Sequence, residues 1–146
     1  MAMSETTNAT TEPTPRMANS EATNAPPPYM VVSLTVKDDI ITSCIIDSVQ
    51  AKVNFDTTGT ITSDLTKEFL SKNELSDGYG MVAWGGAMAE WNVQAASFAS
   101  YVTGKTADEV AGIAVDESTK PTDADLLTSV TIKIGEFQAL IAKACN

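Results

Sequence analysis

The run Met30-Val31-Val32-Ser33-Leu34-Thr35-Val36 decides how the folded part of this 146-residue chain begins. Its apolar residues alternate with serine and threonine, which is the period of a strand with one covered face. After the turn Lys37-Asp38-Asp39, the run from 40 to 49 is rich in β-branched residues and carries apolar side chains on both faces. We expect the two runs to pair as an antiparallel hairpin, the second of them as a central strand.

Two shorter strands are expected to follow this hairpin. Ala51, Val53 and Phe55 alternate, and Asp56-Thr57-Thr58-Gly59 has the composition of a turn, with glycine at the position that tolerates positive φ. Residues 60–62 then return as a fourth strand. The first third of the domain is therefore predicted to be an antiparallel β-meander.

Helical spacing replaces the alternation after residue 64. Helices are predicted at about 65–70, at 87–102, from 107 onward and at 135–144. The clearest one has an apolar stripe formed by Met88, Trp91, Ala95, Phe98 and Val102, and Gly104 ends it. Thr106 and Glu109 form a capping box for the next helix. The fold class is α+β, a β-meander covered by helices, and no internal repeat is recognised.

Residues 1–28 differ in composition from the rest of the chain. They are rich in Thr, Asn, Ala, Glu and Pro, contain no aromatic residue and show no strand or helix period. Such a stretch buries too little apolar area to offset the entropy of ordering it. We expect a disordered or extended tail at 1–28, acting as a spacer or docking on a neighbouring subunit, and a single domain at 29–146.

The charge and the residue types exclude several classes of function. The net charge is −10, from 9 basic and 19 acidic residues, which disfavours nucleic acid and anionic membranes as partners. The absence of histidine excludes Ser-His-Asp catalysis and histidine-containing zinc sites. No apolar run is long enough to insert across a bilayer. Cys44 and Cys145 are compatible with a disulfide and equally with two thiols.

The stretch 76–86 combines four glycines with aromatic side chains. Tyr79, Met81 and Trp84 are candidates for stacking on a planar ligand, because glycines allow a backbone to approach closely. The alternative is that the aromatic residues pin this loop to the core.

A second candidate segment reads Asp125-Leu126-Leu127-Thr128-Ser129-Val130-Thr131 and precedes the last predicted helix. It resembles the flavin-attachment segment of the FMN-binding domain family, found in exported flavoproteins and in the flavin subunits of ion-pumping redox complexes. Asp125, Thr128, Ser129 and Thr131 fit the pattern, whereas Val130 replaces an alanine. The run 91–110 is also similar to small clostridial-type surface lipoproteins of unassigned function. Residues 128–134 alternate as well, so a plain edge strand is the alternative interpretation.

The resemblance implies FMN attached through its phosphate to Thr131, with the cofactor carrying the electrons. It implies an exported electron-transfer domain outside the cell or on its surface, with a redox partner protein and no substrate site of its own. The alternative is a non-catalytic surface or assembly subunit with the same fold, whose tail contacts neighbouring subunits.

Overall fold

The computed structural model describes residues 14–19, 29–50, 54–64, 66 and 68–146. Its sheet has three strands in the order β1 (Thr14–Asn19), β2 (Tyr29–Lys37) and β3 (Ile40–Val49), each antiparallel to its neighbour. Asp38 and Asp39 both have positive φ, 52° and 66°, as a two-residue hairpin turn requires. The predicted hairpin is confirmed.

Two details of the predicted sheet are corrected. The central strand is β2, and β3 lies at an edge, although its apolar residues on both faces indicated the centre. Residues 14–19, which were assigned to the tail, form β1 and pair with β2, so the sheet begins before residue 29. The remaining parts of the predicted tail, 1–13 and 20–28, lie outside the described residues.

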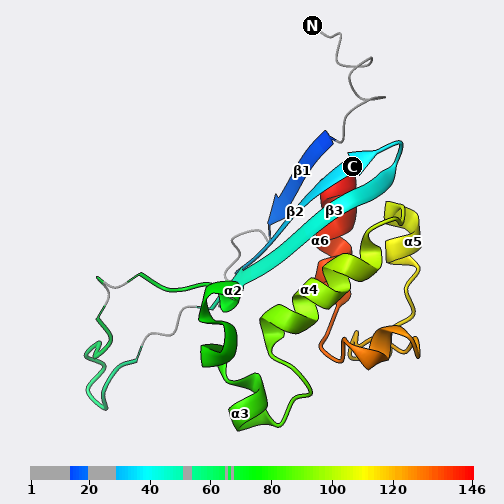
Figure 1. Ribbon diagram of the computed structural model, residues 1–146. Coiled ribbons are helices and arrows are strands. Elements are labelled where there is room, and N and C mark those ends of the chain that lie inside the picture. Colours follow the sequence, from blue (N-terminus) through cyan, green and yellow to red (C-terminus); the bar gives the residue numbers. More distant parts are fainter. Residues whose placement is uncertain (1–13, 20–28, 51–53, 65, 67) are drawn as a thin grey trace, which may run out of the picture.

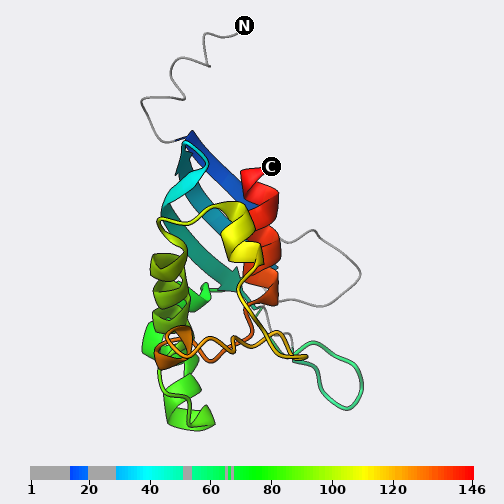
Figure 2. The same cartoon turned by 90° about the vertical axis from the view of Figure 1, so that its right-hand side faces the viewer.

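The helices pack on one face of the sheet. In β2 the side chains of Met30, Val32 and Leu34 are buried while their neighbours are partly exposed, which is the alternation that predicted the strand. Figures 1 and 2 show α4 (Trp91–Val102) running alongside β3, and α6 (Gly135–Cys145) passing behind the strands. The molecule is therefore the α+β arrangement that the sequence predicted.

Aromatic rings join the two long helices. Phe137 of α6 meets Trp91 edge-on at a centroid distance of 6.0 Å, and it meets Phe98 at 5.4 Å. Edge-on and tilted pairs of this kind add to the stabilisation from burial alone. The core thus forms where α4, α6 and the inner face of the sheet meet, and it fixes the first turn of α4 firmly.

Five short elements complete the described structure, and one of them lies where a helix was predicted to start, after Thr106. They are α2 (Lys72–Leu75), η1 (Ser76–Tyr79), α3 (Met81–Gly85), α5 (Ala107–Ala111) and η2 (Leu126–Thr128). The helix predicted at 65–70 is wrong: Phe69 and Leu70 are exposed and non-helical, and α2 begins only after the Ser71 capping box. The Thr106 capping box of α5 is confirmed.

The predicted third and fourth strands are not seen as strands. Residues 51–53 lie outside the described residues, and Phe55 and Ile61 make only an isolated antiparallel bridge. Both side chains are largely exposed, so no buried face is present to extend the pairing. The predicted turn between them is present.

The same turn is built twice, although no internal repeat was recognised in the sequence. In the first turn Asp56 N–H donates to Thr60 O at 2.9 Å, and Gly59 N–H donates to Asp56 O at 3.1 Å. Asp56 Oδ1 accepts from the N–H groups of Thr58 and Thr60 at 2.8 and 3.0 Å.

The second turn repeats these bonds around Asp116. Its N–H donates to Lys120 O at 2.9 Å, and Thr119 N–H donates to Asp116 O at 3.0 Å. Asp116 Oδ1 accepts from the N–H groups of Ser118 and Lys120 at 2.8 and 3.0 Å. An isolated bridge between Val115 and Pro121 closes it, as the bridge between Phe55 and Ile61 closes the first.

Candidate functional site

A concave surface at α3 brings together the three residues that were predicted to stack on a ligand. Tyr79, Met81 and Trp84 line a pocket of about 500 Å³ with Gln50, Gly80 and Gly85. The stretch predicted to be a glycine-rich loop contains η1 and α3, so these side chains stand on short helices. The structure therefore places the three residues at one site.

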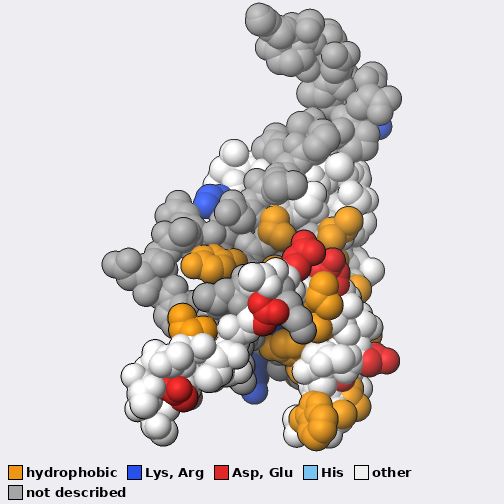
Figure 3. Space-filling view, turned by 90° about the vertical axis from the view of Figure 1, so that its left-hand side faces the viewer, with side chains coloured by type: hydrophobic (Ala, Val, Ile, Leu, Met, Phe, Trp, Pro, Cys, Tyr) orange, Lys and Arg blue, Asp and Glu red, His pale blue; other side chains and the backbone are white. Residues whose placement is uncertain are grey.

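Trp84 is the most exposed large apolar side chain described, with 88% of its surface accessible. Gly80 lies directly against one side of its indole ring, since a Cβ built on Gly80 would come within 2.1 Å of Trp84 Cδ1. Gly80 has φ of 83°, a left-handed conformation that glycine adopts without strain. The absence of a side chain at Gly80 thus lets the indole ring lie against the backbone. The alternative that Trp84 pins this segment to the core is wrong, because the ring is exposed. Figure 3 shows hydrophobic side chains exposed at the lower tip of the molecule, over α3.

Tyr79 is held differently from Trp84. It is half-buried against the core, and its hydroxyl donates to Gln50 Oε1 at 3.2 Å. The buried ammonium of Lys72 lies 4.8 Å from the Tyr79 ring centroid and 5.0 Å from that of Trp91. A cation between two rings stabilises both of them. Tyr79 is therefore a fixed wall of the pocket.

A buried carboxylate anchors α3 to the start of α4. Glu90 accepts from the N–H groups of Met81 and Val82 at 2.8 and 3.0 Å. These two groups are among those that a helix N-terminus leaves without an intrahelical partner. The helix predicted at 87–102 is shorter than expected. Residues 87–90 form the connection from α3, and α4 begins only at Trp91, after Glu90.

The second predicted segment forms the turn η2 and the residues after it. Asp125 precedes η2 and is exposed; its carbonyl oxygen accepts from the Thr128 hydroxyl at 2.7 Å. The Ser129 hydroxyl donates to Leu126 O at 3.5 Å. These short-range bonds make a compact turn of small polar groups. The edge strand suggested by the alternation of 128–134 is absent, because this stretch is irregular between η2 and α6.

Thr131 lies half-buried beside the start of α4. Its N–H donates to Gln94 Oε1 at 2.8 Å, and its hydroxyl donates to the same oxygen at 3.3 Å. Gln94 is fully buried and its amide donates to Ala89 O at 3.0 Å. Gln94 was not singled out in the sequence, although a glutamine next to the apolar stripe of a helix is a signal of a buried polar contact.

The two halves of the predicted site do not share a pocket. The cavity at α3 is lined by Tyr79, Met81 and Trp84 and by none of the residues of the second segment. Ser129 lines a separate open surface with residues of α4. Their structural link is α4: Glu90 holds α3, and Gln94, one turn further along, holds Thr131.

The cysteines are present as thiols, and no disulfide joins Cys44 to Cys145. Burial raises the pKa of the Cys44 thiol to about 12, and the nearby Cys145 adds to the shift. A thiol that remains protonated at neutral pH is a poor nucleophile. Cys44 therefore behaves as a small apolar residue of the inner face of β3.

Within the described ranges, no three His, Cys, Asp or Glu side chains group together in a way that could hold a metal ion. No helix of the same residues has the length and apolarity that a membrane crossing requires.

Comparisons with known proteins add information on the fold alone. The chain matches no model of a known protein family and no curated protein. It is similar to a solution NMR structure of a Clostridium thermocellum protein determined by a structural genomics consortium, with 24% sequence identity and a TM-score of 0.50. The similarity covers 91% of this chain and 88% of that protein, so it extends over nearly the whole arrangement of strands and helices.

Proposed function

We propose that this chain is an FMN-holding electron-transfer module, exported to the cell surface, and not an enzyme with a substrate site of its own. The observation that carries the proposal is Trp84, whose indole is 88% exposed at the mouth of a pocket. Large aromatic side chains are normally buried, and an exposed one beside a concave surface indicates a binding site. An aromatic plane with one side open suits stacking by a planar ring system.

The side chains of the pocket at α3 are of kinds that suit the flat face of an isoalloxazine ring, and this pocket is linked to Thr131 through α4 and not by a shared cavity. Trp84 offers the stacking face, Met81 an adaptable thioether, and Tyr79 a wall held in place by Lys72 and Gln50. When bound, the flavin supplies the electron-accepting and electron-donating chemistry. The protein residues orient the ring and shield one side of it from water.

Thr131 fits the attachment of a phosphate in the way the resemblance implies. Its hydroxyl is half-buried and donates to a neutral amide oxygen, which leaves the hydroxyl oxygen able to react. Val130, which replaces alanine in the resembling pattern, is buried in the core.

The attachment is a phosphoryl transfer that needs a separate transferase and a flavin dinucleotide as donor. The Thr131 oxygen forms a bond to the FMN phosphorus, the pyrophosphate P–O bond breaks, a nucleoside monophosphate leaves, and the hydroxyl proton passes to solvent. Electrons are not exchanged in this step. A tethered cofactor is retained outside the cell, where free flavin is dilute.

The test is visible absorbance and intact mass of the full chain, co-expressed with a flavin transferase. We expect a flavin spectrum and the mass increment of one FMN, both lost in Thr131→Ala and retained in Thr122→Ala, which removes an exposed threonine hydroxyl from the same connection between α5 and α6. Trp84→Ala is expected to keep the mass increment and to alter the flavin spectrum, whereas Val82→Ala changes neither. Colourless protein of unmodified mass that binds no added FMN would refute the proposal.

A second candidate function, an assembly subunit, is favoured by one observation. Phe55 and Ile61 of the first turn, and Phe69 and Leu70 after it, are 69%, 50%, 41% and 49% exposed. Apolar side chains gathered in one exposed stretch are typical of subunit contacts. Sedimentation velocity of the wild type and of Phe55→Ser/Ile61→Ser distinguishes this function: assembly lost in the variant supports it, and a monomer at all concentrations excludes it.

A further inference from the structure

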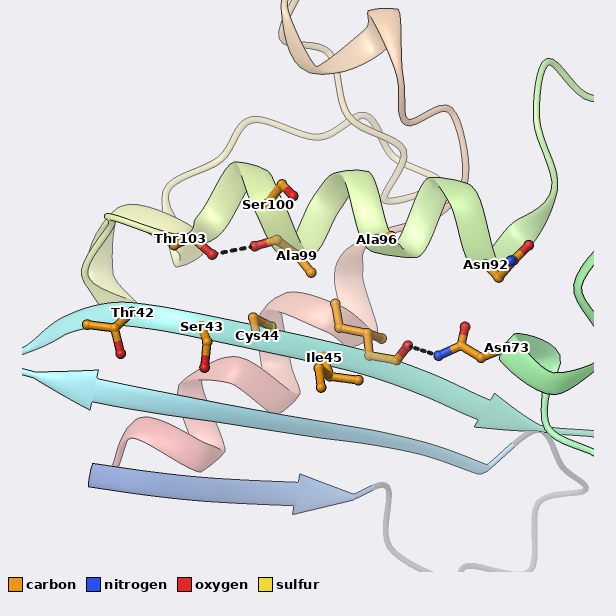
Figure 4. Close-up of a pocket in the computed structure, with 11 residues that line it drawn as sticks. Thr42, Ser43, Cys44, Ile45, Asn73, Asn92, Ala96, Ala99, Ser100 and Thr103 are labelled. Atoms are coloured by element: carbon orange, nitrogen blue, oxygen red, sulfur yellow. Dashed lines mark hydrogen bonds between the residues drawn. The ribbon is translucent and has the colours of Figure 1, made fainter. Parts of the chain in front are cut away.

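A groove runs between the edge strand β3 and helix α4, away from the pocket at α3 (Figure 4). Its volume is about 540 Å³. Residues 42–46 of β3 form its floor, and one wall is formed by side chains of α4 and by Thr103 directly after it: Asn92, Ala96, Ala99, Ser100 and Thr103. Asn73 of the α2 helix stands at one end. The groove therefore lies along the edge of β3 that no described strand covers.

The backbone of β3 alternates between bonds to β2 and groups that point toward the groove. The backbone N–H and C=O of Ile41 point away from β2, because both bond to the turn at residues 104–105. The N–H donates to Lys105 O at 2.9 Å, and the carbonyl accepts from Gly104 N–H at 2.7 Å. The backbone carbonyl of Ile46 also points away from β2, because it accepts from Asn73 Nδ2 at 3.0 Å. These contacts cap the two ends of the edge.

Between the caps, one stretch of the edge has no partner. Cys44 is opposite Leu34 in the same alternation as Ile46 opposite Val32, so its N–H and C=O also face outward. Among the described residues nothing pairs with these two groups or with the Ile46 N–H. Unpaired groups on a strand edge are a template for pairing with another chain.

The edge lacks the features that normally prevent such pairing. Residues 42–46 include no lysine, proline or inward-pointing charge, and Ile45 is 65% exposed on the outer face. The groove lining contains no charged side chain, although the whole chain carries −10. A charged side chain would lose its hydration there without gaining a partner. The small residues of α4 leave room for a backbone to approach.

We propose that this groove binds an extended segment of another protein by β-strand addition, and that the segment is uncharged and rich in β-branched residues. Its backbone pairs with Cys44 and with the Ile46 N–H. Its alternate side chains lie against Ala96 and Ala99 of α4 on one side and next to Ile45 on the other. The pocket at α3 takes no part, so this proposal is independent of flavin binding.

The probe is a fluorescent peptide, acetyl-Thr-Val-Thr-Val-Thr-amide, titrated into the full chain and followed by anisotropy. Four comparisons accompany it: an N-methylated copy that lacks the N–H groups, a copy with Asp in place of the two Val, and the variants Ala96→Lys and Ala139→Lys. Ala96 lines the groove, whereas Ala139 is exposed on α6, so the pair places the same charge on two helices. Amide NMR shifts identify the residues that the peptide contacts.

We expect saturable binding of the neutral peptide, with shifts at Cys44 and Ile46, and about tenfold or greater weakening by N-methylation, by Asp and by Ala96→Lys, with Ala139→Lys unchanged. Absence of binding, or equal binding of the N-methylated peptide, would overturn the proposal. So would a concentration-dependent dimer that protects the Cys44 amide and is not displaced by the peptide, because a second copy would then be the occupant.

Discussion

The two aspartate turns of this chain have matching backbone bonds and opposite surroundings. Asp56 and Asp116 each collect two backbone N–H groups, and each turn needs one residue with positive φ three positions later: Gly59 at 86° and Thr119 at 66°. The turns differ in what lies next to them. The first leaves Phe55 and Ile61 exposed, whereas the second buries Pro121.

Docking of the second turn depends on the start of α6. Thr119 O accepts from Ile134 N–H at 2.8 Å, and a Cβ built on Gly135 would lie 2.9 Å from Thr119 Cβ. Glycine at this position lets the turn contact the helix closely. A positive φ costs a β-branched residue such as Thr119 about 1–2 kcal/mol. The docking against α6 compensates for this strain. A local hydrogen-bond pattern therefore sets the shape of a turn, and tertiary packing decides whether it is part of the core.

Gly135→Val is expected to cause the largest loss in the free energy of unfolding, because it disturbs the docking of the second turn. The added side chain overlaps Thr119, and either the turn or α6 must move, at a cost of about 1–3 kcal/mol. Urea unfolding measures the loss in the free energy of unfolding. Gly85→Val is the control, since nothing lies within 4 Å of a Cβ at Gly85, and its effect should be much smaller. Equal losses would show that the contact with Thr119 is unimportant.

Replacing the aspartate should lower the global stability more in the second turn than in the first. Asp116→Ala removes two bonds from a docked turn and is expected to lower global stability by about 1–2 kcal/mol. Asp56→Ala removes the equivalent bonds from an exposed turn, which can open without unfolding the domain, so its global effect should stay within about 0.5 kcal/mol.

Hydrogen exchange completes this measurement. The amides of Thr58 and Thr60 should exchange faster in Asp56→Ala while those of α4 remain protected. A loss of global stability as large as that of Asp116→Ala would mean that the first turn is docked in solution.

The smallest expected effect is a pH dependence of the first turn. The Thr58 hydroxyl, followed by the backbone N–H groups of Thr60 and Thr58, holds the pKa of Asp56 below its ordinary value of 3.8. The carboxylate therefore supports the turn above about that pH, and the support is lost as the pH falls through the lowered pKa. Carboxyl NMR titration measures the pKa directly. The shift should become smaller in Thr58→Val, which removes the hydroxyl and keeps the backbone N–H donors, and an unshifted Asp56 in the wild type would contradict the bonding described.

The sequence predicted those features whose cause lies within a few residues. The alternation of Met30–Val36 predicted β2, the Thr106 capping box predicted α5, and the composition of residues 56–59 predicted the first turn. It failed for β1 and for the helix at 65–70. The first has few apolar residues and becomes a strand by pairing with β2, and the second has helical spacing but no surface to cover.

Local residue order thus accounts for the hairpin, the caps and the first turn, because sterics and hydrogen bonds within one segment are sufficient to form them. Packing between distant segments decided the rest. Only the assembled fold buries Trp91 against Phe137 while Trp84 is left exposed, and only it brings Gln94 to Thr131. Two tryptophans in one stretch have the same local preferences, and what separates them is which one meets a partner surface when α4 and α6 close over the sheet.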